Sequence, residues 1–353
     1  MTRKTINVPP DVQMLLDRKA PVCVGISGGK DSAAVAWAVA QHLQGYEGPK
    51  LLVHADLGVT EWKDSWESCR RIANRIGWEL VDCRRPSGDM MDRWESRWES
   101  SRRRYTSMET AAVVLPWSTP AMRFCQSELK VDPITSLLKR RFGKVAIINV
   151  TGVRAQESAT RAKQAVCAPA AKLPVGSLAW RPIHHWSVEE VWEAISESGI
   201  EAHEAYEKFG SSRVSCVWCI LASEVDLLAG LKDDRNHALY ARMCGLELAS
   251  GFAFQGNRWL TSLAPELVPD GADRLVQAKE LAVLREAAQM WLPKHLQFTK
   301  GWPNCVPTLE ESAALAEMRR KVCSLYGWET PYATTETVQA RYRELWELKN
   351  RTS

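Results

Sequence analysis

Apolar and polar positions alternate along the first two thirds of the chain in a way that predicts strands followed by helices. Short apolar runs of strand length each precede a longer stretch with helical periodicity. The predicted strands are 21–26, 50–56, 78–83 and 144–152, and the predicted helices are 32–43, 62–77, 130–143 and 186–199. Strands that alternate with helices of this length indicate right-handed βαβ units. We therefore expect an α/β fold of the Rossmann-like kind, with an open parallel sheet and helices on both faces.

The pattern changes in the last third of the chain. The periodicity there is mainly helical, and no run of residues predicts a strand. We expect three parts: a helical N-terminal extension over 1–20, an α/β domain over 21–225 and a mainly helical C-terminal region over 226–353. In the last predicted helix of the α/β domain, Ser187 is the expected N-cap and Glu190 completes a capping box.

Composition narrows the class of protein. The chain has 353 residues, of which 45% are hydrophobic, enough for one large domain or for a domain with a substantial appendage. The sequence has neither an apolar run of about 18 residues nor the apolar core of a signal peptide, so we expect a soluble, cytoplasmic protein without a membrane partner. In that compartment the ten cysteines serve as thiols or metal ligands rather than as disulfides. The net charge of +4 does not by itself indicate a nucleic-acid binder.

A glycine-rich turn separates the first predicted strand from the first predicted helix. It reads Ser27-Gly28-Gly29-Lys30-Asp31-Ser32, and it has the spacing of neither the Walker A loop nor the dinucleotide-binding loop. In an open parallel sheet this first βα turn is the usual phosphate-binding site. Gly28 and Gly29 let the backbone approach an anion, Lys30 supplies a cation, and the first helical amides add the positive end of the helix dipole. Serine hydroxyls at both ends are further donors, so the turn predicts a pyrophosphate-binding loop.

The same six residues resemble the PP-loop of the N-type ATP pyrophosphatases, the adenine nucleotide α-hydrolases of HUP-type fold. Those enzymes split ATP between its α- and β-phosphates and use the adenylyl group to activate a substrate. The resemblance implies that residues 27–32 bind ATP with Mg²⁺ and that Lys30 and Asp31 take part in catalysis. It also implies a role near the nucleotide or its Mg²⁺ for Asp56, which ends the second predicted strand. The alternative for Asp56 is an aspartate that closes a strand and starts a turn.

Four further motifs occur in order along the chain. They are MRFCQSELKVDPI (122–134), VTGVRAQESATRA (150–162), WRPIHHWSVEEVW (180–192) and SRVSCVWC (212–219). Together they resemble the phosphoadenosine phosphosulfate (PAPS) reductase family in its broad sense, which includes the DndC-like proteins of DNA phosphorothioation. The resemblance covers about residues 20–225. It implies that Gly152 and Arg154 meet the nucleotide and that Arg154 and Cys125 act in catalysis, while Arg161 lies either on an anionic group or in a surface salt bridge.

The sequence departs from the PAPS reductases in two respects. Those enzymes end in a Glu-Cys-Gly-(Ile/Leu)-His segment with the attacking cysteine, and the nearest string here is MCGLE at 243–247. They also lack the complete PP-loop, so the retained Lys30 favours ATP over PAPS as the nucleotide. We expect an ATP-dependent enzyme that transfers sulfur through a cysteine site. The alternatives are a reductase that releases sulfite from PAPS or adenylyl sulfate, and a nucleotide-binding module without chemistry.

The pair Cys216-Val-Trp-Cys219 is the centre of the expected cysteine site. Cytosolic C-x2-C pairs bind metals, hold iron–sulfur clusters or run redox chemistry. Relatives with an intact ATP loop often hold a [4Fe–4S] cluster through a cysteine in an Arg-x-Cys motif and this later pair, which implies Cys125, Cys216 and Cys219 here. Cys244 and Cys305 are candidates for the fourth ligand; otherwise the fourth iron stays open to bind sulfide. A zinc site and a simple dithiol remain the alternatives.

Cations flank the first of these cysteines. Arg123 and Lys130 lie on either side of Cys125, and we expect them to lower the pKa of its thiol. The other five cysteines are expected to be buried or incidental thiols; they are Cys23, Cys69, Cys83, Cys167 and Cys323.

The partners of a sulfur-transfer enzyme are a donor and an acceptor of sulfur. A cysteine desulfurase is the expected donor protein, and DNA, tRNA and a small metabolite are the alternative acceptors. One stretch bears on nucleic acid: residues 92–108 interleave aromatic side chains with arginines, as single-strand binding surfaces do. Trp94 and Trp98 are four residues apart, however, as they are in an amphipathic helix. The weak net charge favours the helix.

Overall fold

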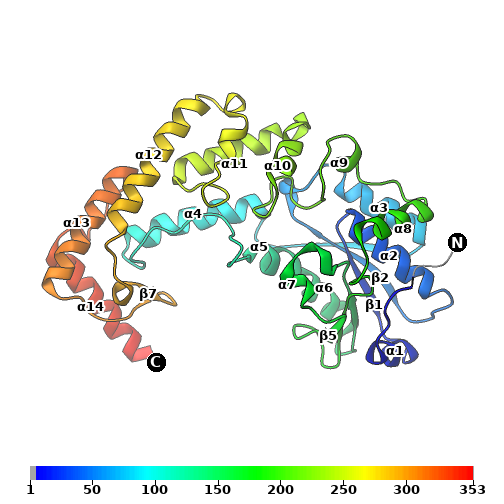
Figure 1. Cartoon of the computed structure of the whole chain (residues 1–353). Coiled ribbons are helices and arrows are strands. Elements are labelled where there is room, and N and C mark those ends of the chain that lie inside the picture. Colours follow the sequence, from blue (N-terminus) through cyan, green and yellow to red (C-terminus); the bar gives the residue numbers. More distant parts are fainter. Residues whose placement is uncertain (1–4, 353) are drawn as a thin grey trace. The chain divides into compact units, whose positions relative to one another are not determined.

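The computed structural model describes residues 5–352, and the chain divides into two compact units (Figure 1). The first unit consists of Met1–Met91 and Ser118–Leu239. The second consists of Asp92–Trp117 and Tyr240–Ser353. The chain therefore leaves the first unit, contributes one segment to the second, returns, and then completes the second unit.

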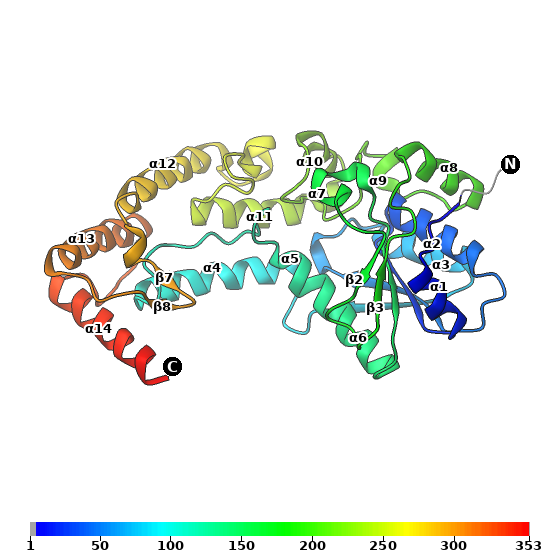
Figure 2. The ribbon, with the colours of Figure 1, turned by 60° about the horizontal axis from the view of Figure 1, so that its bottom comes forward.

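A six-stranded sheet forms the centre of the first unit (Figure 2). Its strands lie in the order β3-β2-β1-β4-β6-β5, and all neighbours are parallel except β5 and β6. The direction of winding reverses between β1 and β4, and ligands of open α/β sheets bind at such a switch point, outside the carboxyl ends of the strands. The strands are β1 Val22–Ile26, β2 Lys50–Asp56, β3 Glu79–Arg84, β4 Ile148–Val150, β5 Cys167–Pro169 and β6 Leu178–Trp180.

Helices cover both faces of this sheet. Alternate side chains of β1 point to opposite faces: Val22 and Val24 pack with α1, α2, α3 and α8, whereas Cys23 packs with Leu138 of α6. Burial on both faces is the reason that these strands read as continuous apolar runs. The helices are α1 Pro10–Asp17, α2 Lys30–His42, α3 Ser65–Ile76, α5 Phe124–Gln126, α6 Asp132–Phe142, α7 Ala159–Ala162, α8 Val188–Ser198, α9 Glu204–Glu207 and α10 Glu224–Leu231.

The α/β fold predicted from the sequence is confirmed, with two differences. The predicted strand 144–152 is shortened to the three residues of β4, and β5 and β6 were not predicted, because three residues are too few to give a periodic signal. The antiparallel β5 also makes the sheet mostly, rather than wholly, parallel. The capping box is confirmed: the Ser187 side chain accepts from the Glu190 amide, and the Glu190 side chain accepts from the Ser187 amide.

The second unit is mainly helical, as predicted for the C-terminal part. It contains one small hairpin that the sequence did not indicate. Its core includes Tyr105 and Val322, which are fully buried. Its elements are α4 Met90–Thr106, α11 His237–Ser250, α12 Gly271–Gln289, α13 Leu309–Tyr326 and α14 Thr335–Thr352, with the strands β7 Phe298–Thr299 and β8 Trp302–Pro303; α4 and α11 begin at the last residues of the first unit.

The two units differ from the three parts expected from the sequence. The described residues of the expected extension over 1–20 belong to the first unit, because Val12 and Leu16 of α1 are buried in its core; residues 1–4 lie outside the described part. The later boundary falls after residue 239, and residues 92–117 belong to the second unit. The local pattern of apolar and polar residues does not indicate that a segment such as 92–117 packs in a different unit from the residues on either side of it. None of the helices within the described residues combines the length and apolar character that crossing a membrane requires.

Candidate functional site

The glycine-rich turn joins the carboxyl end of β1 to the start of α2. Gly28 has φ = +77°, which L side chains rarely adopt, and a Cβ there would lie 2.9 Å from a backbone carbonyl oxygen of α3. Ser32 closes the turn, since its hydroxyl donates to the Gly29 carbonyl at 2.8 Å and accepts from the Ser27 amide at 3.2 Å. α2 begins at Lys30, so the first helical amides and the positive end of the dipole face the turn. This is the geometry of an anion-binding loop.

The loop after β4 closes on the first turn of α2. A Cβ on Gly152 would lie 2.4 Å from the Asp31 carbonyl oxygen, so a larger residue requires the two segments to move apart. Two residues on, Arg154 is only 5% exposed, and its Nε donates to Asp31 Oδ1 at 2.5 Å. Its Nη1 also faces the Trp186 carbonyl at 3.4 Å. The structure thus brings Asp31, Gly152 and Arg154 together, and the guanidinium of Arg154 fixes the carboxylate of Asp31.

A cavity of about 310 Å³ lies beside the turn. Its volume is at the lower end of the range of small-molecule sites, about 300–1,000 Å³. The lining combines the nucleotide loop with residues from β2, from the loop after β4 and from residues 213–215. Charged side chains of both signs line it: the cations are Lys130, Arg161 and Arg213, and the carboxylates are Asp31, Glu61 and Glu157.

Lys30 is buried and held by protein oxygens. Its Nζ donates to the Ser212 carbonyl at 2.9 Å and lies 3.7 Å from Asp31 Oδ2. Its backbone amide donates to the Tyr206 hydroxyl at 2.8 Å. Burial raises the pKa of Tyr206, so this hydroxyl is protonated at neutral pH. Tyr206 lines the cavity but was not singled out in the sequence, where nothing near it marks a link to a loop 176 positions away.

Asp56 and Arg161 occupy different positions relative to the cavity. Asp56 Oδ1 accepts from the Gly58 amide at 2.7 Å, which is the turn-starting role left open for it, and Asp56 is not part of the cavity lining. Glu61, five residues further on, lines the cavity. Arg161 also lines it and forms an ion pair with Glu157, so both interpretations of Arg161 have a structural counterpart.

Glu61 is paired with a buried histidine that the sequence did not single out. His54 of β2 places Nε2 3.0 Å from Glu61 Oε2, Nδ1 3.1 Å from the Ile26 carbonyl oxygen and the same nitrogen 3.6 Å from Cys69 Sγ. Burial by itself lowers the pKa of His54, but hydrogen bonds to Cys69 and Glu61 outweigh it and raise the pKa to about 11. The His54 ring is therefore an imidazolium at neutral pH, and its Nε2 faces the side chain of Glu61. A histidine within an apolar strand gives no sequence signal that separates this role from plain burial.

The cysteine pair lies next to the same cavity. Residues 213–215, which line it, run directly into Cys216, and Cys216 forms an antiparallel backbone bridge with Glu61. Cys219 and Cys125 both act electrostatically on the Cys216 thiol, so the fold brings the three predicted thiols into one neighbourhood. Burial raises the pKa of Cys216 to about 12. Lys130 lowers this pKa, the direction expected of a cation beside a thiol, but burial outweighs it.

The expected metal site rests on these three thiols. Within residues 5–352, no group of three or more His, Cys, Asp or Glu side chains is arranged to hold a metal ion. The thiols are neighbours in this structure rather than a formed metal site. The two candidates for a fourth ligand belong to the second unit: Cys244 is fully buried in α11, and the Cys305 thiol donates to the His295 carbonyl at 3.5 Å. Cys244 is therefore enclosed by the core of its own unit.

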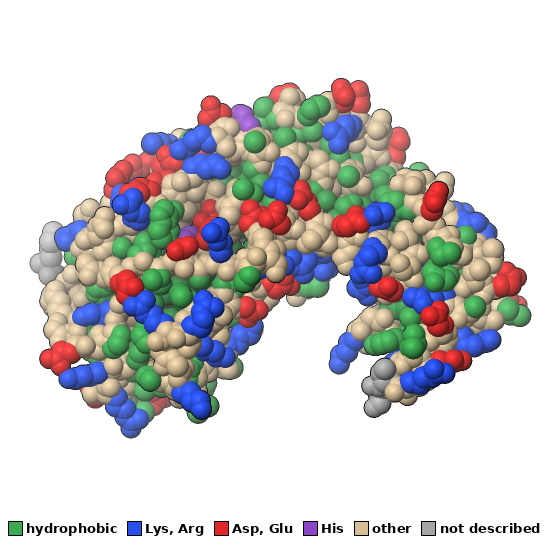
Figure 3. Space-filling model, turned by 180° about the vertical axis from the view of Figure 1, so that it is seen from behind, with side chains coloured by type: hydrophobic (Ala, Val, Ile, Leu, Met, Phe, Trp, Pro, Cys, Tyr) green, Lys and Arg blue, Asp and Glu red, His purple; other side chains and the backbone are tan. Residues whose placement is uncertain are grey.

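The basic, aromatic stretch 92–108 is an amphipathic helix, as the spacing favoured. Trp94 of α4 packs edge-on against Trp117 and Phe254, with ring centroids 5.3 and 6.0 Å apart, and Tyr105 is fully buried. These rings are enclosed in the second unit and do not form a stacking surface for bases. Figure 3 shows Lys and Arg side chains interspersed with Asp and Glu on the face in view.

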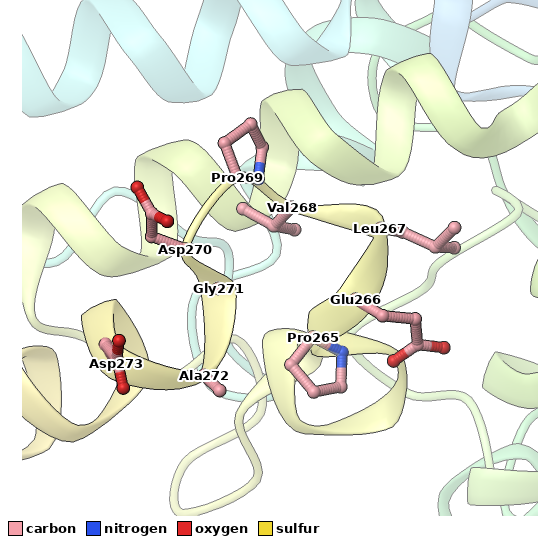
Figure 4. Close-up of a pocket in the computed structure, with 9 residues that line it drawn as sticks. All are labelled: Pro265, Glu266, Leu267, Val268, Pro269, Asp270, Gly271, Ala272 and Asp273. Carbon is pink, nitrogen blue, oxygen red and sulfur yellow. The ribbon is translucent and has the colours of Figure 1, made fainter.

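A second cavity, of about 630 Å³, belongs to the second unit and is lined by residues 265–273, which form the loop before α12 and the start of that helix (Figure 4). None of the predicted site residues lines it. The carboxylate of Glu266 lies apart from those of Asp270 and Asp273, so the loop offers no convergent set of ligands (Figure 4). The candidate functional site is therefore the cavity beside the glycine-rich turn of the first unit.

The mostly parallel sheet, the glycine-rich loop at its switch point and the cavity beside that loop define a nucleotide-binding α/β domain of the PP-loop type. The family model of the phosphoadenosine phosphosulfate reductase domain matches residues 21–222. The chain belongs to this family.

The individual proteins that resemble this chain share little sequence identity with it. An uncharacterized 37.8 kDa protein of Escherichia phage 186 is 28% identical over 239 residues, which cover 58% of this chain and 68% of the phage protein. The PAPS reductase of Candida auris is a solved structure with 14% identity and a TM-score of 0.37, over 55% of this chain and 80% of its own. The FMN adenylyltransferase of Candida glabrata has 14% identity and a TM-score of 0.38, over 56% of this chain and 55% of its own.

Proposed function

We propose that the protein binds ATP with Mg²⁺ in the 310 Å³ cavity, splits it to AMP and pyrophosphate to activate a substrate, and transfers sulfur to the activated position through its cysteine site. The observation that carries this proposal is the shared cavity: its lining contains both the nucleotide loop and residues 213–215, which precede Cys216. An adenylylated atom and an incoming sulfur must meet in one place to react. A cavity that the nucleotide loop lines and the cysteine pair adjoins provides that place.

The residues of the nucleotide loop account for the first half of the reaction. The amides at the start of α2 and the ammonium group of Lys30 bind phosphate oxygens. Arg154 keeps the carboxylate of Asp31 beside the loop, where it is available to a Mg²⁺ ion on the phosphates. Arg161 and Arg213 line the cavity and stabilise the negative charge that develops as pyrophosphate leaves.

The three neighbouring thiols support the second half of the proposed reaction, which is the transfer of sulfur. Cys125, Cys216 and Cys219 are the residues that would hold a [4Fe–4S] cluster, because thiolates are the ligands that such clusters take. A bound cluster would supply a binding site for sulfide. Its charge would also favour the deprotonated form of Cys216, whose thiol is otherwise protonated at neutral pH. A zinc site or a dithiol would use the same pair, and a cysteine desulfurase would supply the sulfur for transfer to DNA, tRNA or a small metabolite.

Turnover of ATP tests the nucleotide half. We expect pyrophosphate release from ATP and Mg²⁺ in the presence of the acceptor, and ATP binding that is weaker by about 10-fold or more in Lys30→Ala, because a charge-assisted hydrogen bond contributes roughly 1.5–3 kcal/mol. Lys144→Ala removes an exposed lysine of the same unit and should leave both quantities unchanged. Unchanged affinity and pyrophosphate release in Lys30→Ala would contradict the assignment.

Anaerobic purification tests the cysteine half. The proposal predicts brown protein with about four iron atoms per chain. Cys216→Ser and Cys219→Ser should lose the colour while still binding ATP, and Cys167→Ser, a change at a half-buried cysteine outside the site, should keep it. Colourless wild-type protein after anaerobic reconstitution, with zinc or no metal bound, would exclude the cluster.

One observation separates this proposal from a reductase of PAPS. The string MCGLE at 243–247, the nearest match to the reductase tail, lies within α11. Cys244 is fully buried there, and burial raises the pKa of its thiol to about 12. A thiol in that state is a poor nucleophile. Sulfite release from PAPS would nevertheless identify a reductase directly.

A further inference from the structure

The segment that leads to the cysteine pair is fastened at both ends; we call residues 211–217 the cysteine strap. At its start, Asp226 of α10 accepts from the Ser212 amide at 2.7 Å through Oδ1 and from the Ser212 hydroxyl at 3.1 Å through Oδ2. At its end, the Val217 amide donates to the Thr60 carbonyl at 2.9 Å. Asp226 is only 4% exposed although Ser212 is exposed, so the Asp226 carboxylate lies away from bulk water, where the loss of its hydrogen-bond partners is costly.

Between its two ends the strap contacts the nucleotide loop. The Ser212 carbonyl accepts from Lys30 Nζ at 2.9 Å. Val214 packs against the turn so closely that a Cβ on Gly29 would lie 3.1 Å from the Val214 Cβ. A single residue, Ser212, is thus held by Asp226 through its amide and by the PP-loop lysine through its carbonyl. Four residues further on is Cys216.

We propose that the cysteine strap couples the nucleotide loop to the cysteine pair, with Asp226 as the residue that positions the strap. This inference rests on the proposed function, because it takes Lys30 as a phosphate ligand. The ammonium group of Lys30 makes a charge-assisted hydrogen bond to either acceptor, but a phosphate oxygen adds the attraction of its own negative charge, so the phosphates of ATP compete effectively with the Ser212 carbonyl for Lys30. When the lysine turns to a phosphate, the strap loses one of its fastenings, and the exposure of Cys216 increases. Nucleotide binding is thereby linked to access to the cysteines.

The rate of alkylation by iodoacetamide reports access to each thiol. Reduced, metal-depleted full-length protein is alkylated with and without ATP and Mg²⁺, and modification of Cys216 and Cys219 is followed by mass spectrometry. We expect ATP to increase the rate at Cys216 by about 5-fold or more, the lower end of typical couplings between sites. In Asp226→Ala the rate should be high already without ATP and should no longer respond to it. Asp226→Asn keeps an acceptor oxygen and should restore part of the response.

A matched control separates the strap from the helix that carries its anchor. Ser223→Ala removes the 2.8 Å hydrogen bond from Ser223 to Asp226 at the start of α10 without touching the strap, and it should retain the ATP response. If Asp226→Ala fails to fold, Ser212→Ala removes the hydroxyl bond to Asp226 and should reduce the response.

The outcomes distinguish the coupling from the proposed function itself. ATP binding without any change in alkylation overturns the coupling and leaves the proposed function standing. The coupling is also overturned if ATP slows alkylation equally in the wild type and in Asp226→Ala. Equal slowing indicates that the nucleotide shields the thiol directly. Failure of the wild-type protein to bind ATP overturns the proposed function, and the coupling with it.

Discussion

Arg154 and Asp31 form an ion pair across 123 positions of the chain, with Arg154 Nε 2.5 Å from Asp31 Oδ1. The pair joins the loop after β4 to the first turn of α2, where a carboxylate is favoured by the helix dipole. It therefore fixes the nucleotide loop from the neighbouring strand. The sequence indicated both residues as members of one site, but not that they bind each other.

Removal of Arg154 should destabilise the first unit. We expect Arg154→Met to lower the free energy of unfolding by about 3 kcal/mol, because breaking a buried ion pair costs roughly 3–5 kcal/mol and the Asp31 side chain is partly exposed. Arg70→Met breaks the exposed pair with Glu67 and should cost less than about 1 kcal/mol. Denaturant titration measures both. Equal losses would show that the Arg154 pair is no stronger than a surface pair.

The close approach of the β4 loop to α2 makes Gly152 sensitive to a single methyl group. A Cβ there would lie 2.4 Å from the Asp31 carbonyl oxygen, and overpacking of this kind typically costs about 1–3 kcal/mol. We expect Gly152→Ala to lose that much stability and to bind ATP more weakly, since the loop must shift. In Gly245→Ala of α11, the new Cβ meets no atom within 4 Å beyond its chain neighbours and its own helical backbone, so this change should be neutral or stabilising. Calorimetry and ATP titration of the two variants check this.

Acid should weaken the first unit through His203. Its side chain is fully buried, and Nδ1 accepts from the Ala205 amide at 3.0 Å at the start of α9. Burial lowers the pKa of His203 to about 4, with the carboxylates of Asp64 and Glu204 opposing and Arg71 assisting. The unfolded chain has a pKa near 6.5, so it binds the proton more readily than the folded protein does. The contribution to stability is therefore complete above about pH 6.5, and about 3 kcal/mol is lost as the pH falls towards 4.

The variant His203→Asn tests this pH dependence. Asparagine keeps an acceptor for the cap but does not titrate. Between pH 7.5 and 4.5 the variant should lose less unfolding free energy than the wild type. His185→Asn, at an exposed histidine, should lose as much as the wild type. Identical pH profiles for His203→Asn and the wild type would disprove the assignment.

A buried glutamate organises the second unit. Glu247 of α11 is fully buried, and its carboxylate accepts from the amides of Phe254, Leu260 and Thr261 at 2.7–2.8 Å and from the Thr261 hydroxyl at 2.7 Å. Glu247→Ala leaves these donors unpaired, and each buried unpaired group costs about 1–3 kcal/mol. We expect the second unit to lose about 3 kcal/mol or more. Glu280→Ala changes an exposed position of α12 and should alter the melting temperature of the second unit little.

Local sequence patterns predicted several secondary-structure elements of this protein and the family to which it belongs. The sequence predicted β1, the glycine-rich turn and the helix that follows it. These features could be predicted because strand and helix periodicities and the φ of Gly28 depend on residues adjacent in the chain. The capping box of α8 was read for the same reason. The order of the motifs indicated the PAPS reductase family, which the match over 21–222 bears out.

Tertiary structure alone decided which groups meet the nucleotide loop. Tyr206 and Ser212 lie 176 and 182 positions from Lys30. Ser212 begins the motif 212–219, but nothing in the spacing of that motif links either residue to the loop. Likewise, the Asp56 side chain accepts a hydrogen bond from the nearby Gly58 amide, whereas Glu61 lines the cavity. The conformation of the turn after β2 determines where these two side chains point. A local pattern fixes which face of an element is buried, but not which distant segment covers it. That partner is selected only when packing and hydrogen bonding are satisfied across the whole fold.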